Sequence, residues 1–88
     1  MIRRRVLVSG RVQGVFFRDT CRRVATAAGV GGWVRNLPDG RVEAVFEGAD
    51  ADVARMLDWA GQGPRSAVVT DVAVHEEPPE GLTGFTVR

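Results

Sequence analysis

The sequence contains no lysine, only one cysteine and one histidine, and no long apolar run. The single cysteine, Cys21, excludes an internal disulfide and a cysteine-based metal cluster, and such sparing use of cysteine is typical of the reducing cytoplasm. The apolar run nearest the N-terminus, Val6-Leu7-Val8, is too short for a signal-peptide core or a membrane-spanning helix. We therefore expect a cytoplasmic protein without membrane association.

An excess of charge of either sign is also missing. The 12 arginines are balanced by 11 acidic residues, which leaves a formal net charge of +1 at pH 7. That charge is too small to indicate a nucleic-acid or anionic-membrane partner, and we interpret the basic run Arg3–Arg5 as the solvated start of a strand rather than as a nucleic-acid-binding arm. With 88 residues, 44% of them hydrophobic, we expect one soluble domain over residues 1–88, monomeric and of bacterial source.

Hydrophobic periodicity divides the chain into strands and helices. Alternating or valine-rich segments predict strands, and apolar residues spaced three and four apart predict helices. The predicted strands cover residues 2–9, 30–37, 41–48, 67–75 and 85–88. The first predicted helix begins at Phe17 and ends at Gly29. The second is capped by Asp50 or a residue nearby and is ended by Gly61 and Gly63 with Pro64. A polar loop is predicted over residues 76–81.

The order of these elements is strand, helix, strand, strand, helix, strand, followed by a short tail strand. Right-handed crossover connections place the first strand between the others. The predicted fold is therefore α+β, a ferredoxin-like split β-α-β sandwich with an antiparallel four- to five-stranded sheet and two helices on one face.

A glycine loop between the first strand and the first helix is the most informative segment. Gly10 and Gly14 allow backbone amides to approach a ligand, and Arg18 follows at the start of the helix. Loop amides, a helix N-terminus and a planar guanidinium together suit a phosphate group. The spacing matches neither the Walker nor the dinucleotide pattern, so we expect a cradle for one phosphoryl group. The alternative is a surface arginine beside two ordinary turn glycines.

Asn36 is the second candidate, at the end of a strand and before the tight turn 37–40. It has two interpretations: an amide that bonds its own turn, or an amide that holds a water molecule. Cys21, on the apolar helix face, and His75, alone on its strand, are interpreted as structural residues, as are Trp33 and Trp59. No His, Asp and Glu side chains show the spacing of a metal site.

A site with a cation and an amide but no acid, base or nucleophile restricts the chemistry. It can promote phosphoryl transfer only by positioning and electrostatics. Without a general acid the leaving group must depart as an anion. A carboxylate, with a pKa near ~4, leaves readily, whereas an alkoxide does not. The residues therefore favour an acyl phosphate that is attacked by water.

Two segments resemble the signatures of the acylphosphatase family: VSGRVQGVFFR over residues 8–18 and GGWVRNLPDGRVE over residues 31–43. The likeness extends over essentially the whole chain. It departs at the end, Phe85-Thr86-Val87-Arg88, where many members carry a terminal tyrosine or a Lys/Arg-rich ending.

The resemblance implies hydrolysis of acyl phosphates to carboxylate and inorganic phosphate, without metal or cofactor. It implies that Asn36 orients the attacking water and that the substrate's own phosphate accepts the water's proton. It also implies that the phosphate is bound by the Arg18 guanidinium and by the backbone amides of Gln13, Gly14, Val15, Phe16, Phe17 and Arg18.

The alternative function is a non-catalytic ferredoxin-like module that binds a small ligand or RNA. An RNA-binding sheet displays aromatic side chains on its middle strands. Here the first strand has none, and Phe46 shares its face with Val42 and Ala44, the face that we expect the helices to cover.

Overall fold

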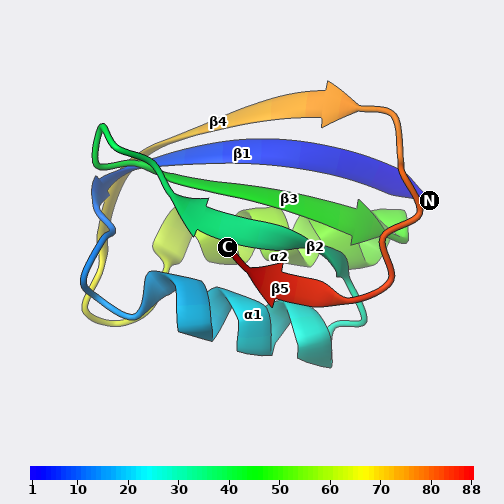
Figure 1. Ribbon diagram of the computed structural model, residues 1–88, viewed down its shortest axis with the longest axis horizontal. Helices are drawn as coiled ribbons and strands as arrows, with labels where there is room; N and C mark the ends of the chain where they lie inside the picture. Colours follow the sequence, from blue (N-terminus) through cyan, green and yellow to red (C-terminus); the bar gives the residue numbers. More distant parts are fainter.

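A five-stranded sheet with two helices on one of its faces makes up the computed structural model, which describes all 88 residues (Figure 1). The elements along the chain are β1 (Ile2–Arg11), α1 (Phe17–Ala27), β2 (Gly31–Asn36), β3 (Val42–Gly48), α2 (Asp50–Gln62), β4 (Val68–Glu77) and β5 (Phe85–Val87). The strand order is β4-β1-β3-β2-β5, with β1 between β4 and β3. The predicted ferredoxin-like α+β fold is confirmed.

The tail strand differs from the prediction in its direction. The four longer strands pair antiparallel, but β5 pairs parallel with β2, so the sheet is mixed and the expectation of a wholly antiparallel sheet is wrong. The reason is the path of residues 78–84, which run from the end of β4 past one end of the sheet (Figure 1). The chain therefore enters β5 at the end where β2 also begins.

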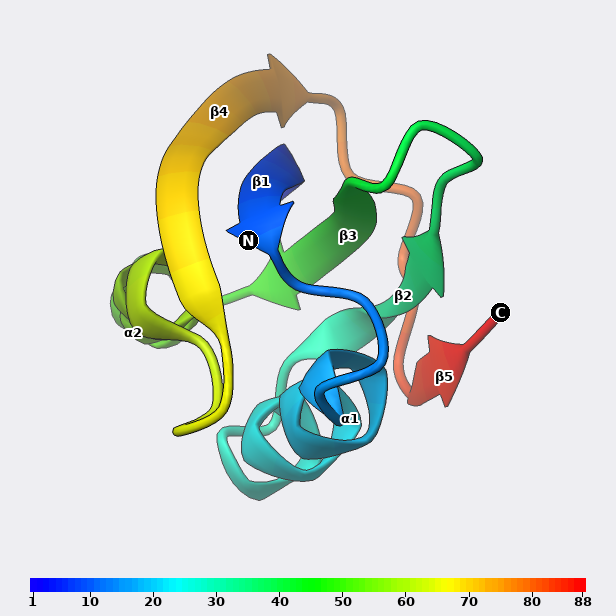
Figure 2. The same ribbon diagram turned by 90° about the vertical axis from the view of Figure 1, so that its left-hand side faces the viewer.

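The core lies between the sheet and the two helices, as the end-on view in Figure 2 shows. Both predicted apolar helix stripes are confirmed, because these buried residues recur at helical spacing: Phe17, Cys21 and Ala25 on α1, and Val53, Met56 and Ala60 on α2. Phe46 is fully buried in this core with Val42 and Ala44, as expected. No helix is both long and apolar enough to traverse a lipid bilayer.

Some predicted boundaries are wrong by one or two residues. The N-cap of α2, expected at Asp50 or nearby, is the adjacent Ala49, and no side chain caps it; Asp50 lies in the first turn, where its carboxylate complements the helix dipole. β1 continues beyond Ser9 to Arg11 through an irregularity at Gly10, since both added residues pair with β4. Glu76 and Glu77 belong to β4 and not to the loop, because they pair with Arg4 and Arg3.

The sheet face opposite the helices carries arginines and glutamates, which we call the outer-face ion pairs. They join Arg3 to Glu47 at 2.7 Å and to Glu77 at 2.9 Å, Arg5 to Glu43 at 3.1 Å and to Glu77 at 3.0 Å, and Arg35 to Glu43 at 2.6 Å. The interpretation of Arg3 as a solvated residue is wrong, because it is buried. Strand register explains this: β1 lies between two strands, and Arg3 is directly opposite both Glu47 and Glu77.

Candidate active site

Residues 12–16, which we call the phosphate loop, join β1 to α1 in an unusual backbone conformation. Gly14 has φ 74°, and Phe16, which caps α1, has φ 63° and ψ 25°, the left-handed region that a bulky side chain rarely adopts. A left-handed residue in such a turn brings successive backbone N–H groups to one side of the chain. The first turn of a helix adds N–H groups without intrahelical partners. The loop therefore has the geometry of an anion-binding nest.

Three sets of contacts hold the phosphate loop in place. The side chains of Val12 and Val15 are buried in the core. The Gln13 side-chain amide donates to the carbonyl oxygens of Leu37, at 2.7 Å, and Arg41, at 3.0 Å. On the other side, the Ser66 hydroxyl donates to the carbonyl oxygen of Val15 at 2.8 Å. The loop is thus fixed to the β2–β3 turn and to the α2–β4 connection.

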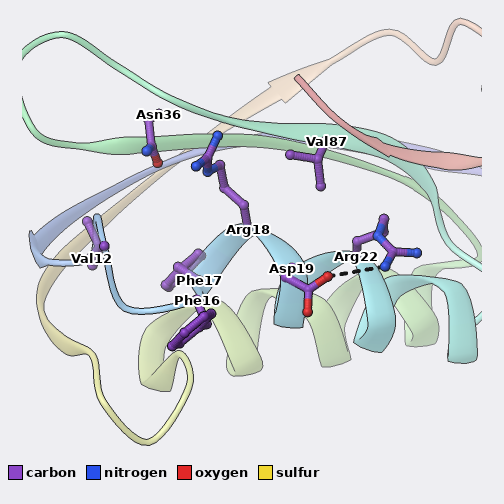
Figure 3. A pocket seen from close by; sticks show the side chains of 9 residues that line it. Val12, Phe16, Phe17, Arg18, Asp19, Arg22, Asn36 and Val87 are labelled. Carbon is purple, nitrogen blue, oxygen red and sulfur yellow. Dashed lines mark hydrogen bonds and ion pairs between the residues drawn. The ribbon is translucent and has the colours of Figure 1, made fainter.

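The structure contains one pocket, with a volume of about 540 Å³, between the phosphate loop, α1, the end of β2 and β5. Its lining residues are Val12, Gly14, Phe16, Phe17, Arg18, Asp19, Arg22, Asn36 and Val87 (Figure 3). The end of β2 lies beside the phosphate loop, so both candidate functional side chains, Arg18 and Asn36, line the same pocket.

Arg18 lies in the first turn of α1, and its side chain has no hydrogen bond or ion pair with any other residue of the protein. Its neighbour Asp19 is the one acidic residue of the pocket, and it is bound by Arg22 at 3.2 Å and by Arg23 at 3.0 Å. Figure 3 shows the Arg18 side chain directed across the pocket toward Asn36. The planar guanidinium therefore keeps all of its donors for a ligand.

Asn36 ends β2, and its Oδ1 is buried without a hydrogen-bond partner, the only buried side-chain atom of which this is true. The interpretation of Asn36 as a turn-bonding residue is not supported. Asp39 has that role instead, because its carboxylate accepts the Arg41 backbone N–H at 3.0 Å. Buried polar atoms nearly always have a partner, so this exception in a pocket-lining residue requires an explanation.

The other residues predicted to bind phosphate lie differently with respect to the pocket. Gly14, Phe16 and Phe17 line the pocket, whereas Gln13 and Val15 do not and could offer only backbone groups. The Phe17 ring packs against Trp59 at 5.0 Å between centroids.

Sequence reasoning missed four lining residues: Val12, Asp19, Arg22 and Val87. Helical spacing could have predicted that Arg22 lines the pocket, because Arg22 lies one helical turn after Arg18. Nothing local indicated Val87, because its place depends on the parallel pairing of β5.

The residues interpreted as structural lie apart from the pocket. Cys21 is buried, and burial raises the pKa of its thiol, so the thiolate needed for nucleophilic attack is disfavoured. His75 is exposed on β4. Trp33 packs beneath the guanidinium of Arg88, 4.4 Å from the ring centroid. No three His, Cys, Asp or Glu side chains are grouped as a metal site would require.

Comparisons with known proteins agree with this architecture. The family model described as Acylphosphatase matches residues 4–87. The chain is 60% identical over 86 residues to an acylphosphatase of Haloarcula marismortui, covering 98% of this chain and 94% of that protein. It is 59% identical over 86 residues to an acylphosphatase of Gloeobacter violaceus, covering 98% and 92% respectively. The crystal structure of an acylphosphatase from Bacillus subtilis superposes with a TM-score of 0.96 at 36% identity, covering 100% of this chain and 99% of that one. The chain therefore belongs to the acylphosphatase family, and it is an enzyme that hydrolyses acyl phosphates.

Proposed function

We propose that the pocket cleaves the carboxyl–phosphate bond with Arg18 as the phosphate anchor and Asn36 as the holder of the attacking water. The backbone amides from Gln13 to Arg18 bind the remaining phosphate oxygens. The observation that carries this proposal is the unpartnered, buried Oδ1 of Asn36 in the same pocket as the unpaired guanidinium of Arg18. The protein leaves both the Arg18 cation and the Asn36 amide oxygen without a partner in this pocket. The cation suits a phosphate, and the amide suits a water molecule.

Arg18 acts through electrostatics. Phosphoryl transfer spreads negative charge over the three oxygens that surround phosphorus in the transition state. A guanidinium and amides that are already held in place stabilise that charge without reorganising during the reaction. The anchored phosphate loop provides this rigidity, since Gln13 and Ser66 fix it from opposite sides.

Asn36 acts on the water. Its side-chain amide, which lines the pocket, forms a hydrogen bond with the water and directs an oxygen lone pair of the water toward phosphorus. Asp19 is the one acidic residue of the pocket, and its two carboxylate oxygens are engaged by Arg22 and Arg23. The water's proton therefore passes to an oxygen of the substrate's phosphate. As the new P–O bond forms, the bond to the acyl oxygen breaks, its electron pair leaves with the carboxylate, and the products are carboxylate and inorganic phosphate.

The broader setting of the enzyme is part of the proposal. We expect one catalytic domain over residues 1–88, monomeric, cytoplasmic and of bacterial source, although its relatives include a protein of the archaeon Haloarcula. We also expect no nucleic-acid partner. The outer face of β1 and β3 carries the outer-face ion pairs, in place of the aromatic side chains on which RNA bases stack.

Purified protein assayed on benzoyl phosphate tests the proposal, with phenyl phosphate as the control ester. We expect the enzyme to hydrolyse benzoyl phosphate but not phenyl phosphate, because the pocket offers no acid to protonate the phenoxide that phenyl phosphate would release. Activity should survive exhaustive chelation, and inorganic phosphate should inhibit competitively since it fits the same cradle. Rescue of chelated enzyme by magnesium or zinc would overturn the metal-free mechanism, and purely non-competitive inhibition would overturn the phosphate loop as the site.

A further inference from the structure

We propose that Arg22 forms a second anion subsite, so that the enzyme favours acyl phosphates whose acyl group carries an additional anionic group such as a carboxylate. The inference rests on the proposed position of the phosphate at Arg18. It extends that proposal from the reacting carboxyl–phosphate bond to the acyl group, which leaves as the carboxylate.

The pocket extends along α1 from the phosphate loop to Arg22. Arg18 and Arg22 both line it and are one helical turn apart, about 6 Å along the axis. In Figure 3, Arg18 lies beside Asn36, Arg22 lies farther along the helix, and Val87 of β5 is on the opposite wall. A substrate with its phosphate at Arg18 can therefore extend its acyl group past Val87 toward Arg22.

The charge of this wall exceeds what one phosphate anchor requires. Two guanidiniums, of Arg18 and Arg22, and one carboxylate, that of Asp19, line the pocket, and this carboxylate is also bound by Arg23 from outside the pocket. Arg22 contacts Asp19 through one nitrogen at 3.2 Å, longer than the usual ~2.8 Å of a strong charge-assisted bond. Its other donors are available to a ligand.

A surface ion pair alone does not account for the position of Arg22. Arg23 binds the other carboxylate oxygen of Asp19 at 3.0 Å and lies outside the pocket, with 73% of its side chain exposed. Asp19 thus has a partner without Arg22. Arg23 is also a natural control: the same residue type, on the same helix, with the same ion-pair partner, but away from the acyl group.

The test compares benzoyl phosphate with 4-carboxybenzoyl phosphate, two rigid substrates that differ by one carboxylate. For wild type and for Arg22→Gln and Arg23→Gln, the measured quantity is the ratio of kcat/KM for the carboxylated substrate to that for benzoyl phosphate. We expect a ratio above one in wild type, a fall of about tenfold in Arg22→Gln, as for loss of one bond to a charged group, and a change of less than about twofold in Arg23→Gln. Asp19→Asn, which releases Arg22, should raise the ratio.

The outcomes separate this inference from the proposed function. If wild type hydrolyses neither substrate, the proposed function fails. If benzoyl phosphate is hydrolysed but the ratio is the same in wild type and Arg22→Gln, only the second anion subsite is overturned. An equal fall in Arg23→Gln would also overturn it, since the preference would then reflect general positive charge. Should Arg22→Gln not fold, the Asp19→Asn ratio decides, and a ratio at or below that of wild type overturns the subsite.

Discussion

The arginines on the outer face of the sheet and Arg18 in the pocket differ in their pairing. On the outer face, Arg3, Arg5 and Arg35 each lie within 3.1 Å of a glutamate. In the pocket, Arg18 has no partner, although it is only one residue from Asp19. An arginine is therefore paired where the strand register places a glutamate opposite it, and its guanidinium stays unpaired where the fold places no acid beside it.

A matching contrast separates two buried polar groups, the Glu47 carboxylate and the Oδ1 atom of Asn36. The Glu47 carboxylate is fully buried and accepts hydrogen bonds from Arg3 and from the backbone N–H groups of residues 80–82. The Asn36 Oδ1 is equally buried and accepts none. Complete pairing favours folding, and an unmatched group lowers stability but remains available for chemistry. Substitutions at these positions should separate effects on activity from effects on stability.

The largest effect is expected at Arg18. Arg18→Ala should lower kcat/KM by on the order of 10³- to 10⁴-fold, through both KM and kcat, because the guanidinium contacts phosphate in the ground state and the transition state. Arg18→Lys keeps the charge but loses the planar fork, so it should also lose most activity. Steady-state kinetics on benzoyl phosphate measures this, with circular dichroism to establish folding and Arg23→Lys as the control. Near-normal turnover by folded Arg18→Lys would remove this residue from the mechanism.

Asn36→Ala should show a different kinetic pattern. An interaction with the attacking water strengthens in the transition state, so kcat should fall a few hundredfold, about 3–4 kcal/mol, while KM changes little. Because the substitution removes an unsatisfied buried acceptor, the free energy of unfolding should not decrease in proportion. The same assays together with urea denaturation measure both quantities. A raised KM with unchanged kcat would instead assign Asn36 to substrate binding.

The outer face should respond in stability and not in activity. Glu47→Gln removes the charge from a buried, multiply bonded pair, and we expect it to lower the free energy of unfolding by about 3 kcal/mol. Arg35→Gln, at a pair whose arginine is 47% exposed, should lower it by less than about 1 kcal/mol. Urea denaturation at pH 7 compares the two variants. Equal losses would show that burial does not distinguish these pairs.

The smallest of these effects is the acid dependence of stability. Burial alone raises the pKa of Glu47, but Arg3 and the backbone N–H groups of residues 80–82 outweigh it, so the pKa lies below its usual value. Hydrogen bonds from Arg3 and Arg5 lower the pKa of Glu77 as well. Stability from these carboxylates is therefore complete above their unfolded pKa of about 4.3 and is lost as the pH falls through the lower folded values. Urea midpoints between pH 7 and pH 3 should decrease less in Glu47→Gln than in wild type, and parallel curves would contradict the assignment.

Local sequence patterns predicted the helices, the strands and their topology. They did not predict the features that depend on contacts between segments far apart in the sequence. The buried stripes of α1 and α2 followed from helical spacing, and the phosphate loop from its glycines and Arg18. The burial of Arg3 could not be predicted in this way, because it depends on two glutamates of other strands that lie opposite Arg3 in the sheet. The pairing of Gln13 with the β2–β3 turn, and the place of Val87 in the pocket, likewise depend on segments far away in the sequence.

The two anchors of the phosphate loop also have a consequence for the speed of binding. Gln13 and Ser66 hold the loop through hydrogen bonds within the protein, so folding fixes its shape before a ligand arrives. Ligand association then requires no loop closure, a step that takes microseconds to milliseconds in enzymes with mobile lids. In stopped-flow measurements, phosphate should therefore bind in a single phase whose observed rate rises linearly with phosphate concentration and reaches no plateau.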